Sequence, residues 1–253
     1  MTRSLVLAAL AACTALLTAC GGGSPASPSE EAHRVGDSCA DLVILGARGS
    51  TQNPELNSGV GTEVRLTTDR LIQLIHTRSE HSVALQAIRY DSAATRTVDD
   101  FMAHAAAGSR TMTSTLRSIA RSCPDSRFAL LGFSQGAQVV HGAATRMPSA
   151  LARRVALVAM IADPRRDPGD RILHWTYTGR PATLPGKLGP GGPIDPDLRA
   201  VAISLCVAGD EICNDRGAPS SAPSKTHKHF YEQPSSVRST AAELDRILQT
   251  RGL

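Results

Sequence analysis

A serine framed by glycines lies in the middle of the chain, between an apolar run and a helical pattern. Residues 132–136 read Gly-Phe-Ser-Gln-Gly, with Ser134 at the centre. This order is typical of a nucleophile elbow, a tight strand-to-helix turn that lifts a serine oxygen above the end of a sheet. The glycines are needed because the turn leaves no room for side chains beside the serine. The motif indicates nucleophilic attack by the Ser134 hydroxyl, with a purely structural Gly-Ser turn as the alternative.

Carboxylates and imidazoles that could activate this serine follow it in the chain. A serine nucleophile needs a base, and the base needs an acid that orients it. His227 and His229 precede the last helical pattern, and Asp210 lies in the segment Cys-Val-Ala-Gly-Asp-Glu-Ile-Cys. Glu211 is an alternative acid, and so is Asp163, which follows another apolar run. The order serine, acid, histidine is that of the α/β-hydrolases.

Apolar runs that alternate with helical patterns indicate the elements that must hold these groups. We expect strands at 41–47, 83–88, 128–133, 155–161 and 198–207, and helices at 60–77, 97–122, after Ser134 and at 237–248. This alternation favours one α/β domain with a doubly wound, mainly parallel sheet of about five strands and helices on both faces. Residues 163–196 are rich in glycine and proline, and this stretch is either a cover over the site or an exposed loop.

The first residues have the features of an export signal. Arg3 gives a positive start, residues 5–17 are apolar, and Leu-Thr-Ala-Cys at 17–20 resembles a bacterial lipobox. We therefore expect a signal peptide over 1–19, a lipidated Cys20 and flexible tether over 20–37, and a single domain over 38–253. The alternative is an ordinary secretory signal with an incidental cysteine.

Cysteine count and charge limit the classes of function. Four of the six cysteines remain after the predicted cleavage and lipidation: Cys39, Cys123, Cys206 and Cys213. An even set in an exported chain suggests two disulfides, although spacing alone permits three pairings. No C-x-x-C pair occurs, so no metal site is indicated. The net charge of +4 comes without a basic stripe carrying aromatic residues, so no nucleic-acid partner is indicated.

Four separate patterns in the right order make the chain similar to the cutinase family of small secreted serine esterases, as an actinobacterial-type lipoprotein member. They span about residues 38–250: Ser-Cys-Ala-Asp-Leu-Val at 38–43 with Ala-Arg-Gly-Ser-Thr at 47–51, Cys-Pro-Asp at 123–125 with Gly-Phe-Ser-Gln-Gly-Ala at 132–137, Cys-x-x-x-Asp-x-x-Cys at 206–213, and a histidine near an aromatic residue. The resemblance implies an α/β-hydrolase sheet without a lid, disulfides Cys39–Cys123 and Cys206–Cys213, and ester hydrolysis through an acyl-enzyme.

The resemblance also implies roles for single residues. Ser134 would attack the ester carbonyl, a histidine would take its proton, and Asp210 would orient that histidine. The backbone N–H of Gln135, the residue after the nucleophile, would form one half of the oxyanion hole. Ser50 would supply the second donor through its N–H and its hydroxyl; without the resemblance it would be interpreted as an ordinary turn residue.

The histidine pattern of the family, His-x-x-Tyr, is matched only in part. His227 fits with Phe230 in the place of the tyrosine, whereas His229 precedes Tyr231 by two residues and fits only if the loop changes register. We favour His227 as the base and keep His229 as the alternative. A zinc site at this pair would lack further cysteine or histidine ligands nearby, so none is expected.

These features predict a serine carboxylesterase of the cutinase type that cleaves short- or medium-chain acyl esters or envelope lipids. Phospholipase or thioesterase activity would use the same machinery, and a catalytically silent envelope binding or scaffold protein is the alternative from another class. No cofactor is implied, because the oxyanion hole does the work of a Lewis acid. We expect an exported monomer, held by its lipid at the outer face of the cytoplasmic membrane or in the cell envelope, or else secreted.

Overall fold

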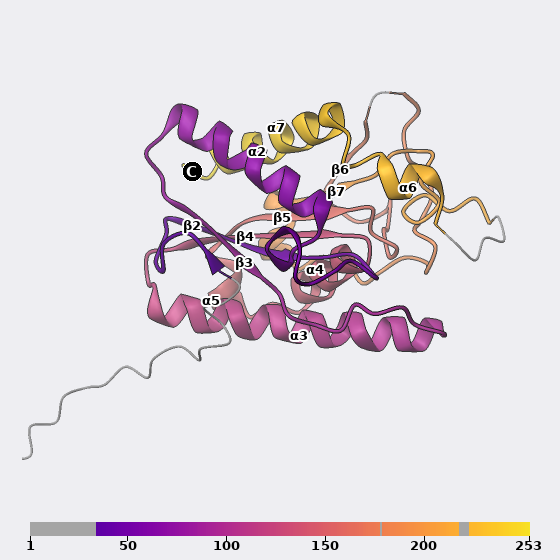
Figure 1. The fold of residues 1–253 in the computed structure, drawn as a ribbon, viewed down its shortest axis with the longest axis horizontal. Coiled ribbons are helices and arrows are strands. Elements are labelled where there is room, and N and C mark those ends of the chain that lie inside the picture. The colour runs from indigo at the N-terminus through magenta and orange to yellow at the C-terminus, as the bar shows by residue number, and fades with distance from the viewer. Residues whose placement is uncertain (1–33, 178, 218–222) are drawn as a thin grey trace, which may run out of the picture.

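The structure is a computed structural model. A seven-stranded sheet runs through its centre (Figure 1). Its strands are β1 (Arg34–Val35), β2 (Leu42–Ala47), β3 (Val83–Ala87), β4 (Arg127–Phe133), β5 (Val155–Ile161), β6 (Leu173–Trp175) and β7 (Ala202–Leu205). They lie in the order β1-β3-β2-β4-β5-β7-β6, and every neighbouring pair is parallel apart from β1 and β3. The mainly parallel sheet is confirmed, but it has more strands than the five predicted. The additional β1 and β6 are two and three residues long, too short to leave a pattern in the sequence.

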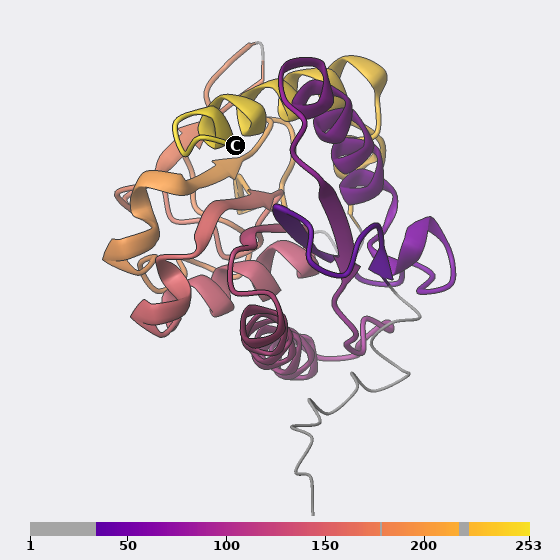
Figure 2. The ribbon, with the colours of Figure 1, turned by 90° about the vertical axis from the view of Figure 1, so that its left-hand side faces the viewer.

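Helices cover both faces of the sheet, as predicted (Figures 1 and 2). They are α2 (Thr62–Arg78), α3 (Val98–Ser122), α4 (Gln135–Thr145), α5 (Ser149–Ala152), α6 (Lys225–His229) and α7 (Pro234–Gln249), with 3-10 turns at Asn57–Gly59 and Pro196–Val201. The helices α2 and α7 pack together on one face, and α3 and α4 pack together on the other. Because both faces are covered, every residue of β2 and β5 is buried, which explains their continuous apolar runs.

One predicted strand is shorter than expected. Residues 198–207 were expected to be extended, whereas Pro196–Val201 forms a 3-10 turn and only Ala202–Leu205 is β7. The Asp195 side chain accepts a hydrogen bond from the Asp197 N–H at the start of this turn, and Pro196 occupies its first position. Both features favour a helical start, so the local cap overrides the apolar pattern.

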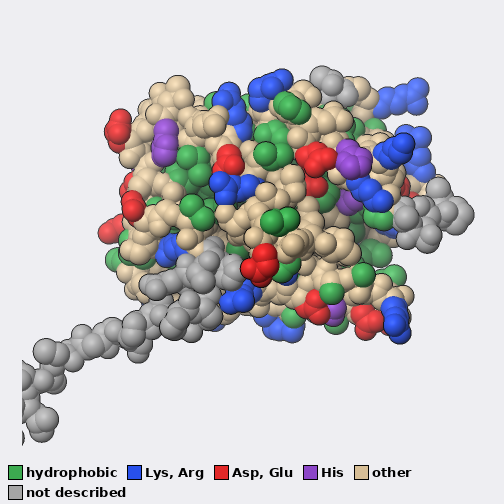
Figure 3. Space-filling view, in the orientation of Figure 1, with side chains coloured by type: hydrophobic (Ala, Val, Ile, Leu, Met, Phe, Trp, Pro, Cys, Tyr) green, Lys and Arg blue, Asp and Glu red, His purple; other side chains and the backbone are tan. Residues whose placement is uncertain are grey.

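The structure describes residues 34–177, 179–217 and 223–253. The predicted signal peptide, Cys20 and the tether up to residue 33 lie outside these ranges. The last part of the predicted tether belongs to the sheet, because Arg34–Val35 pairs with β3 ahead of the boundary expected at residue 38. Within the described ranges, no helix is both long and apolar enough to span a bilayer. Acidic and basic side chains are interspersed on the face drawn in Figure 3.

The strand order places one edge of the sheet where a site can form. From β2 the chain moves outward to β3, then returns to β4 on the other side of β2, with Ala47 opposite Gly132. The carboxyl ends of β2 and β4 therefore lie side by side where the strand order reverses. Ligands of open α/β sheets bind at such a point. A Cys39–Cys123 disulfide ties the segment before β2 to the residue after α3.

Candidate active site

Ser134 occupies a strained turn between β4 and α4. Its backbone has φ 55° and ψ −118°, and its hydroxyl does not cap α4 although it stands at the N-cap position. A Cβ added to Gly132 would lie 2.1 Å from the Gly136 carbonyl oxygen, and one added to Gly136 would lie 2.0 Å from that of Ala47. Only glycine fits at either position, and the close approach holds the Ser134 oxygen above the sheet.

A continuous chain of hydrogen bonds connects Ser134 with a histidine and an aspartate. Nε2 of His227 lies 3.1 Å from Oγ of Ser134. Nδ1 of His227 lies 3.0 and 3.1 Å from the two carboxylate oxygens of Asp210. Asp210 is fully buried, and His227 is 5% exposed. The structure thus brings together three of the predicted site residues, in the geometry of a base that is oriented by an acid.

Further donors hold the Asp210 carboxylate. One oxygen accepts the Ile212 N–H at 2.9 Å, and the other accepts the Tyr231 hydroxyl at 2.8 Å. The Tyr231 oxygen in turn accepts the Val207 N–H at 3.2 Å. Burial raises the pKa of Tyr231 well above its ordinary value, so the phenol stays protonated and can donate. The carboxylate therefore has little freedom to turn away from His227.

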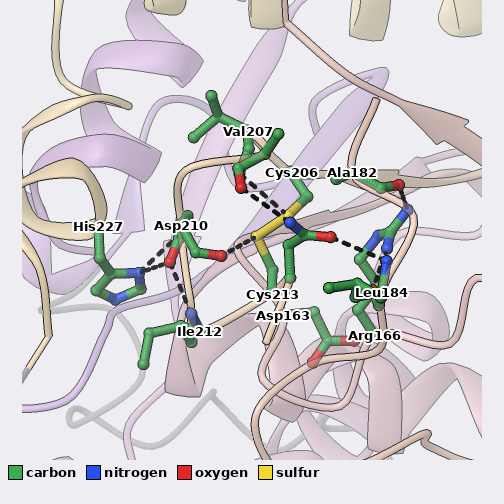
Figure 4. The surroundings of a disulfide bond; sticks show 12 residues. Asp163, Arg166, Ala182, Leu184, Cys206, Val207, Asp210, Ile212, Cys213 and His227 are labelled. Atoms are coloured by element: carbon green, nitrogen blue, oxygen red, sulfur yellow. Dashed lines mark hydrogen bonds and ion pairs between the residues drawn. A yellow bond between two sulfur atoms is a disulfide. The ribbon is translucent and has the colours of Figure 1, made fainter. Parts of the chain in front are cut away.

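The loop that carries Asp210 is closed by the Cys206–Cys213 disulfide and braced by the stretch 163–196 (Figure 4). The Asn214 side chain donates to the Ala208 carbonyl at 2.8 Å and accepts the Leu184 N–H at 2.9 Å. Buried Arg166 donates to the Leu184 carbonyl at 2.7 Å and to the Ala182 carbonyl at 2.8 Å. The stretch, expected to be a cover or an exposed loop, therefore also supports the acid loop.

The position of His227 is set by the start of α6 and by an aromatic neighbour. Ser224 caps α6 by accepting the His227 N–H at 3.2 Å, and the Ser224 N–H donates to Glu211 at 2.6 Å. Burial alone would raise the pKa of Glu211, but the hydrogen bonds from Ser224 hold it below its ordinary value. The Phe133 ring stacks on the imidazole with centroids 5.0 Å apart. Glu211, the alternative acid, thus fixes the helix start, whereas the ring nitrogens of His227 bond to Asp210 and Ser134.

His229 lies on the surface. Its side chain is 63% exposed, and its Nδ1 is 2.8 Å from Oε1 of Glu232. Its imidazole is therefore engaged outside the Ser134 and Asp210 pair, and of the two candidate histidines the structure brings only His227 to Ser134.

Asp163, the other alternative acid, pairs with a different histidine. Its carboxylate lies 2.6 Å from Nδ1 of His141 on α4, and Nε2 of His141 lies 2.7 Å from the Gly192 carbonyl oxygen. Burial opposes the charge on His141, but Asp163 and the Gly192 carbonyl outweigh it and raise the pKa of His141 to about 9. This buried pair joins α4 to both ends of the 163–192 segment and does not contact the Ser134 triad.

We expect this pair to make stability depend on pH. The folded pKa of His141, about 9, lies above the value of about 6.5 for an unfolded histidine. The stabilisation should be complete below about pH 6.5 and lost as the pH rises through about 9, a change of about 3 kcal/mol in the free energy of unfolding. The free energy of unfolding, measured by urea denaturation, should fall between about pH 6.5 and 9 in the native protein. It should fall equally in His229→Gln, a control at an exposed site. Retention of the same loss in His141→Gln would contradict the assignment.

The two predicted oxyanion donors follow β4 and β2. Gln135 is the first residue of α4, whose N-terminus favours negative charge. Ser50 follows Gly49, at which an added Cβ would lie 3.0 Å from the Phe133 ring, so this loop borders the elbow. Among the described residues, neither the Ser50 N–H nor the Gln135 N–H has a hydrogen-bond partner. The role of these two N–H groups as oxyanion donors stays a prediction.

A clamp that the sequence did not indicate holds the loop after β2. The Gln52 side chain accepts the Gly49 N–H at 2.6 Å and donates to buried Glu63 at 2.6 Å. The Thr51 N–H donates to the Ser92 carbonyl at 2.6 Å. Gln52 and Glu63 are 11 positions apart in the sequence, and Tyr231 and Asp210 are 21 apart, so no local pattern could have found these contacts. Over the described ranges, no group of three or more His, Cys, Asp or Glu side chains could hold a metal ion.

A serine–histidine–aspartate chain at the carboxyl edge of a doubly wound sheet defines the molecule as an α/β-hydrolase. The sequence profile of the cutinase family matches residues 38–242, and the chain belongs to that family. It is accordingly a serine carboxylic ester hydrolase.

Known relatives agree with this assignment. Carboxylesterase Culp1 of Mycobacterium tuberculosis is 30% identical over 181 residues, which cover 72% of each chain. The cutinase of Botryotinia fuckeliana is 30% identical over 135 residues, 53% of this chain and 61% of that one. A solved cutinase-like protein from Cryptococcus sp. has a TM-score of 0.65 at 17% identity and covers 84% of this chain and 97% of its own. The Trichoderma reesei cutinase in complex with a phosphonate inhibitor has a TM-score of 0.58 at 23% identity, with 84% and 78% covered. Both structures show the shared fold.

Proposed function

We propose that the protein cleaves short- or medium-chain acyl esters, or lipids of the cell envelope, through a covalent acyl-enzyme on Ser134. One observation carries the proposal: the hydrogen bonds that run from the Ser134 oxygen through both nitrogens of His227 to the buried Asp210 carboxylate. This arrangement provides a nucleophile, a base in reach of its proton, and an acid that keeps the imidazole in one tautomer. The protein acts as a monomer in this proposal.

The proton moves as follows. His227 Nε2 takes the hydroxyl proton while Oγ of Ser134 bonds to the ester carbonyl carbon, and Asp210 stabilises the resulting imidazolium. The imidazolium then gives the proton to the departing alcohol oxygen as the ester C–O bond breaks, which leaves the acyl group on Ser134. A water molecule attacks this acyl-enzyme by the same steps and releases the carboxylic acid. The N–H groups of Gln135 and Ser50 stabilise the oxyanion, and losing one such donor typically costs about 10²–10³-fold in rate.

The direct test is turnover together with labelling of the nucleophile. We expect the purified protein to hydrolyse p-nitrophenyl butyrate and to take up one fluorophosphonate, located on Ser134 by peptide mass mapping. A series of acyl chain lengths, with a phospholipid and a thioester included, would then define the substrate. Absence of both turnover and label would support the alternative of a catalytically silent scaffold protein.

We also propose that the protein is anchored by lipid on Cys20. The two disulfides and the relatives indicate an exported protein, and the lipobox-like sequence before Cys20 supports the anchor. The variant Cys20→Ser should move the protein from the membrane fraction to the soluble exported fraction, measured by immunoblot. The matched control is Cys13→Ser within the predicted signal peptide, which should leave the protein in the membrane fraction. Membrane retention of Cys20→Ser would disprove the anchor.

A further inference from the structure

A cavity of about 580 Å³ opens between α3 and α4. These two helices lie on the face of the sheet opposite α2 and α7 (Figures 1 and 2). Small residues from both helices line the cavity: Ala105, Ser109, Gly142 and Ala143. They bring the helices close together, since the Ser109 hydroxyl donates to the Val139 carbonyl at 2.8 Å and a Cβ on Gly142 would lie 2.5 Å from the Ser109 oxygen. None of the Ser134, His227 and Asp210 side chains lines this cavity.

The charged residues that line the cavity are basic. Four arginines border it, Arg110 and Arg117 from α3, Arg146 from the end of α4 and Arg165 from the loop after β5, and no aspartate or glutamate lines it. Over the described residues, Arg110, Arg117 and Arg146 form no ion pair. Like charges gathered around one cavity without counter-ions repel one another and attract an anion.

The acidic group beneath the cavity does not neutralise these arginines. Asp163 is 1% exposed, and its carboxylate is occupied by His141 at 2.6 Å and by the Arg165 N–H at 2.9 Å. His141 forms part of the cavity wall, and both of its ring nitrogens are already hydrogen-bonded. Both Asp163 oxygens are therefore engaged away from the guanidinium groups of the rim arginines.

We propose that this cavity between α3 and α4 is a binding site for a phosphoryl anion, separate from the esterase site. Guanidinium groups match the oxygens of phosphate with two parallel hydrogen bonds, so an arginine cluster favours this chemistry. Arg110 and Arg117 are seven residues apart, about 10.5 Å along the helix axis, which suits a ligand with more than one anionic oxygen group. The ligand is the headgroup of an anionic phospholipid or a soluble phosphorylated compound.

The test compares two double variants of equal charge in the chain carrying Cys20→Ser, so that a lipid anchor cannot contribute. Arg110→Gln/Arg117→Gln removes two rim charges, and the control Arg238→Gln/Arg251→Gln removes two exposed charges from α7 and the residues after it, across the sheet. Pyrophosphate binding is measured by titration calorimetry, and vesicle binding by co-sedimentation with phosphatidylglycerol or phosphatidylcholine. The rim variant should weaken binding at least about tenfold, and the control should not.

The two arms distinguish the source of the ligand. Binding to phosphatidylglycerol vesicles without pyrophosphate binding indicates a lipid headgroup, and the reverse indicates a soluble ligand. Equal losses in both double variants, or no binding of either probe by the native rim, would overturn the proposal. Hydrolysis of p-nitrophenyl butyrate should be unchanged in the rim variant, which separates this outcome from failure of the proposed esterase. As a measurement without variants, whichever probe binds should protect Arg110 and Arg117 from phenylglyoxal, and unprotected modification in the presence of that probe would also overturn the proposal.

Discussion

Replacement of Ser134 by alanine should lower kcat/KM for p-nitrophenyl butyrate by about 10⁴–10⁶-fold, the loss typical of serine hydrolases that lose their nucleophile. The reason is that, among the described residues, the hydroxyl hydrogen-bonded to His227 Nε2 is that of Ser134, at 3.1 Å. Any remaining rate would come from the oxyanion donors and from substrate binding. Initial rates with active-site titration would measure the loss.

The fold should survive this change, which gives a control for the loss of activity. Ser134 has φ 55°, and alanine keeps the same Cβ, so Ser134→Ala should unfold in urea at nearly the native midpoint. Ser134→Gly should be equally inactive but more stable, by about 1 kcal/mol or more, because glycine adopts this backbone without strain. Activity above about one hundredth of native in either variant would contradict Ser134 as the nucleophile.

Replacement of His227 by alanine should cost about as much as the loss of Ser134, about 10⁴–10⁶-fold in kcat/KM. Without the imidazole the hydroxyl keeps its proton at neutral pH, and Asp210 has no base to orient. The matched control is His229→Ala, two residues away on the same short helix, whose 63% exposed side chain pairs with Glu232. It should keep activity within about twofold of native, as surface substitutions away from a site usually do.

Non-additivity provides a second criterion for His227. If it works with Ser134 as one unit, Ser134→Ala/His227→Ala should be no slower than either single variant. Near-native rates in His227→Ala, or a large loss in His229→Ala, would transfer the role to His229 and would require α6 to turn in solution. Additive losses in the double variant would show that the two residues act independently.

The residues closest to the reaction differ in how far away in the sequence their supporting contacts lie. The bend at Ser134 depends on Gly132 and Gly136, two residues to either side, so five consecutive residues encode it. The long strands and helices were also predictable, because a strand such as Val155–Ile161 is buried along its whole length and must be apolar throughout. The edge strands β1 and β6 were missed, since two or three residues leave no periodicity.

The choice among equivalent groups required the tertiary structure. His227 and His229 differ by two positions in the sequence, but only the turn begun at Ser224 and Glu211 directs His227 toward Ser134, 93 residues away along the chain. Asp163 was the competing acid position in the sequence, behind Asp210, and the structure pairs it with His141.

The sequence by itself determined the chemistry of this protein: a serine on a glycine-framed bend, an acid between two cysteines, and the alternating elements that hold them at one edge of a sheet. Only the tertiary structure decided which imidazole completes the chain, that Tyr231 holds the Asp210 carboxylate, and that four arginines surround one cavity between α3 and α4. The physical reason is the distance along the sequence between the interacting residues. Residue patterns report contacts within a few positions, whereas hydrogen bonds and charge clusters between distant segments exist only after the elements have packed.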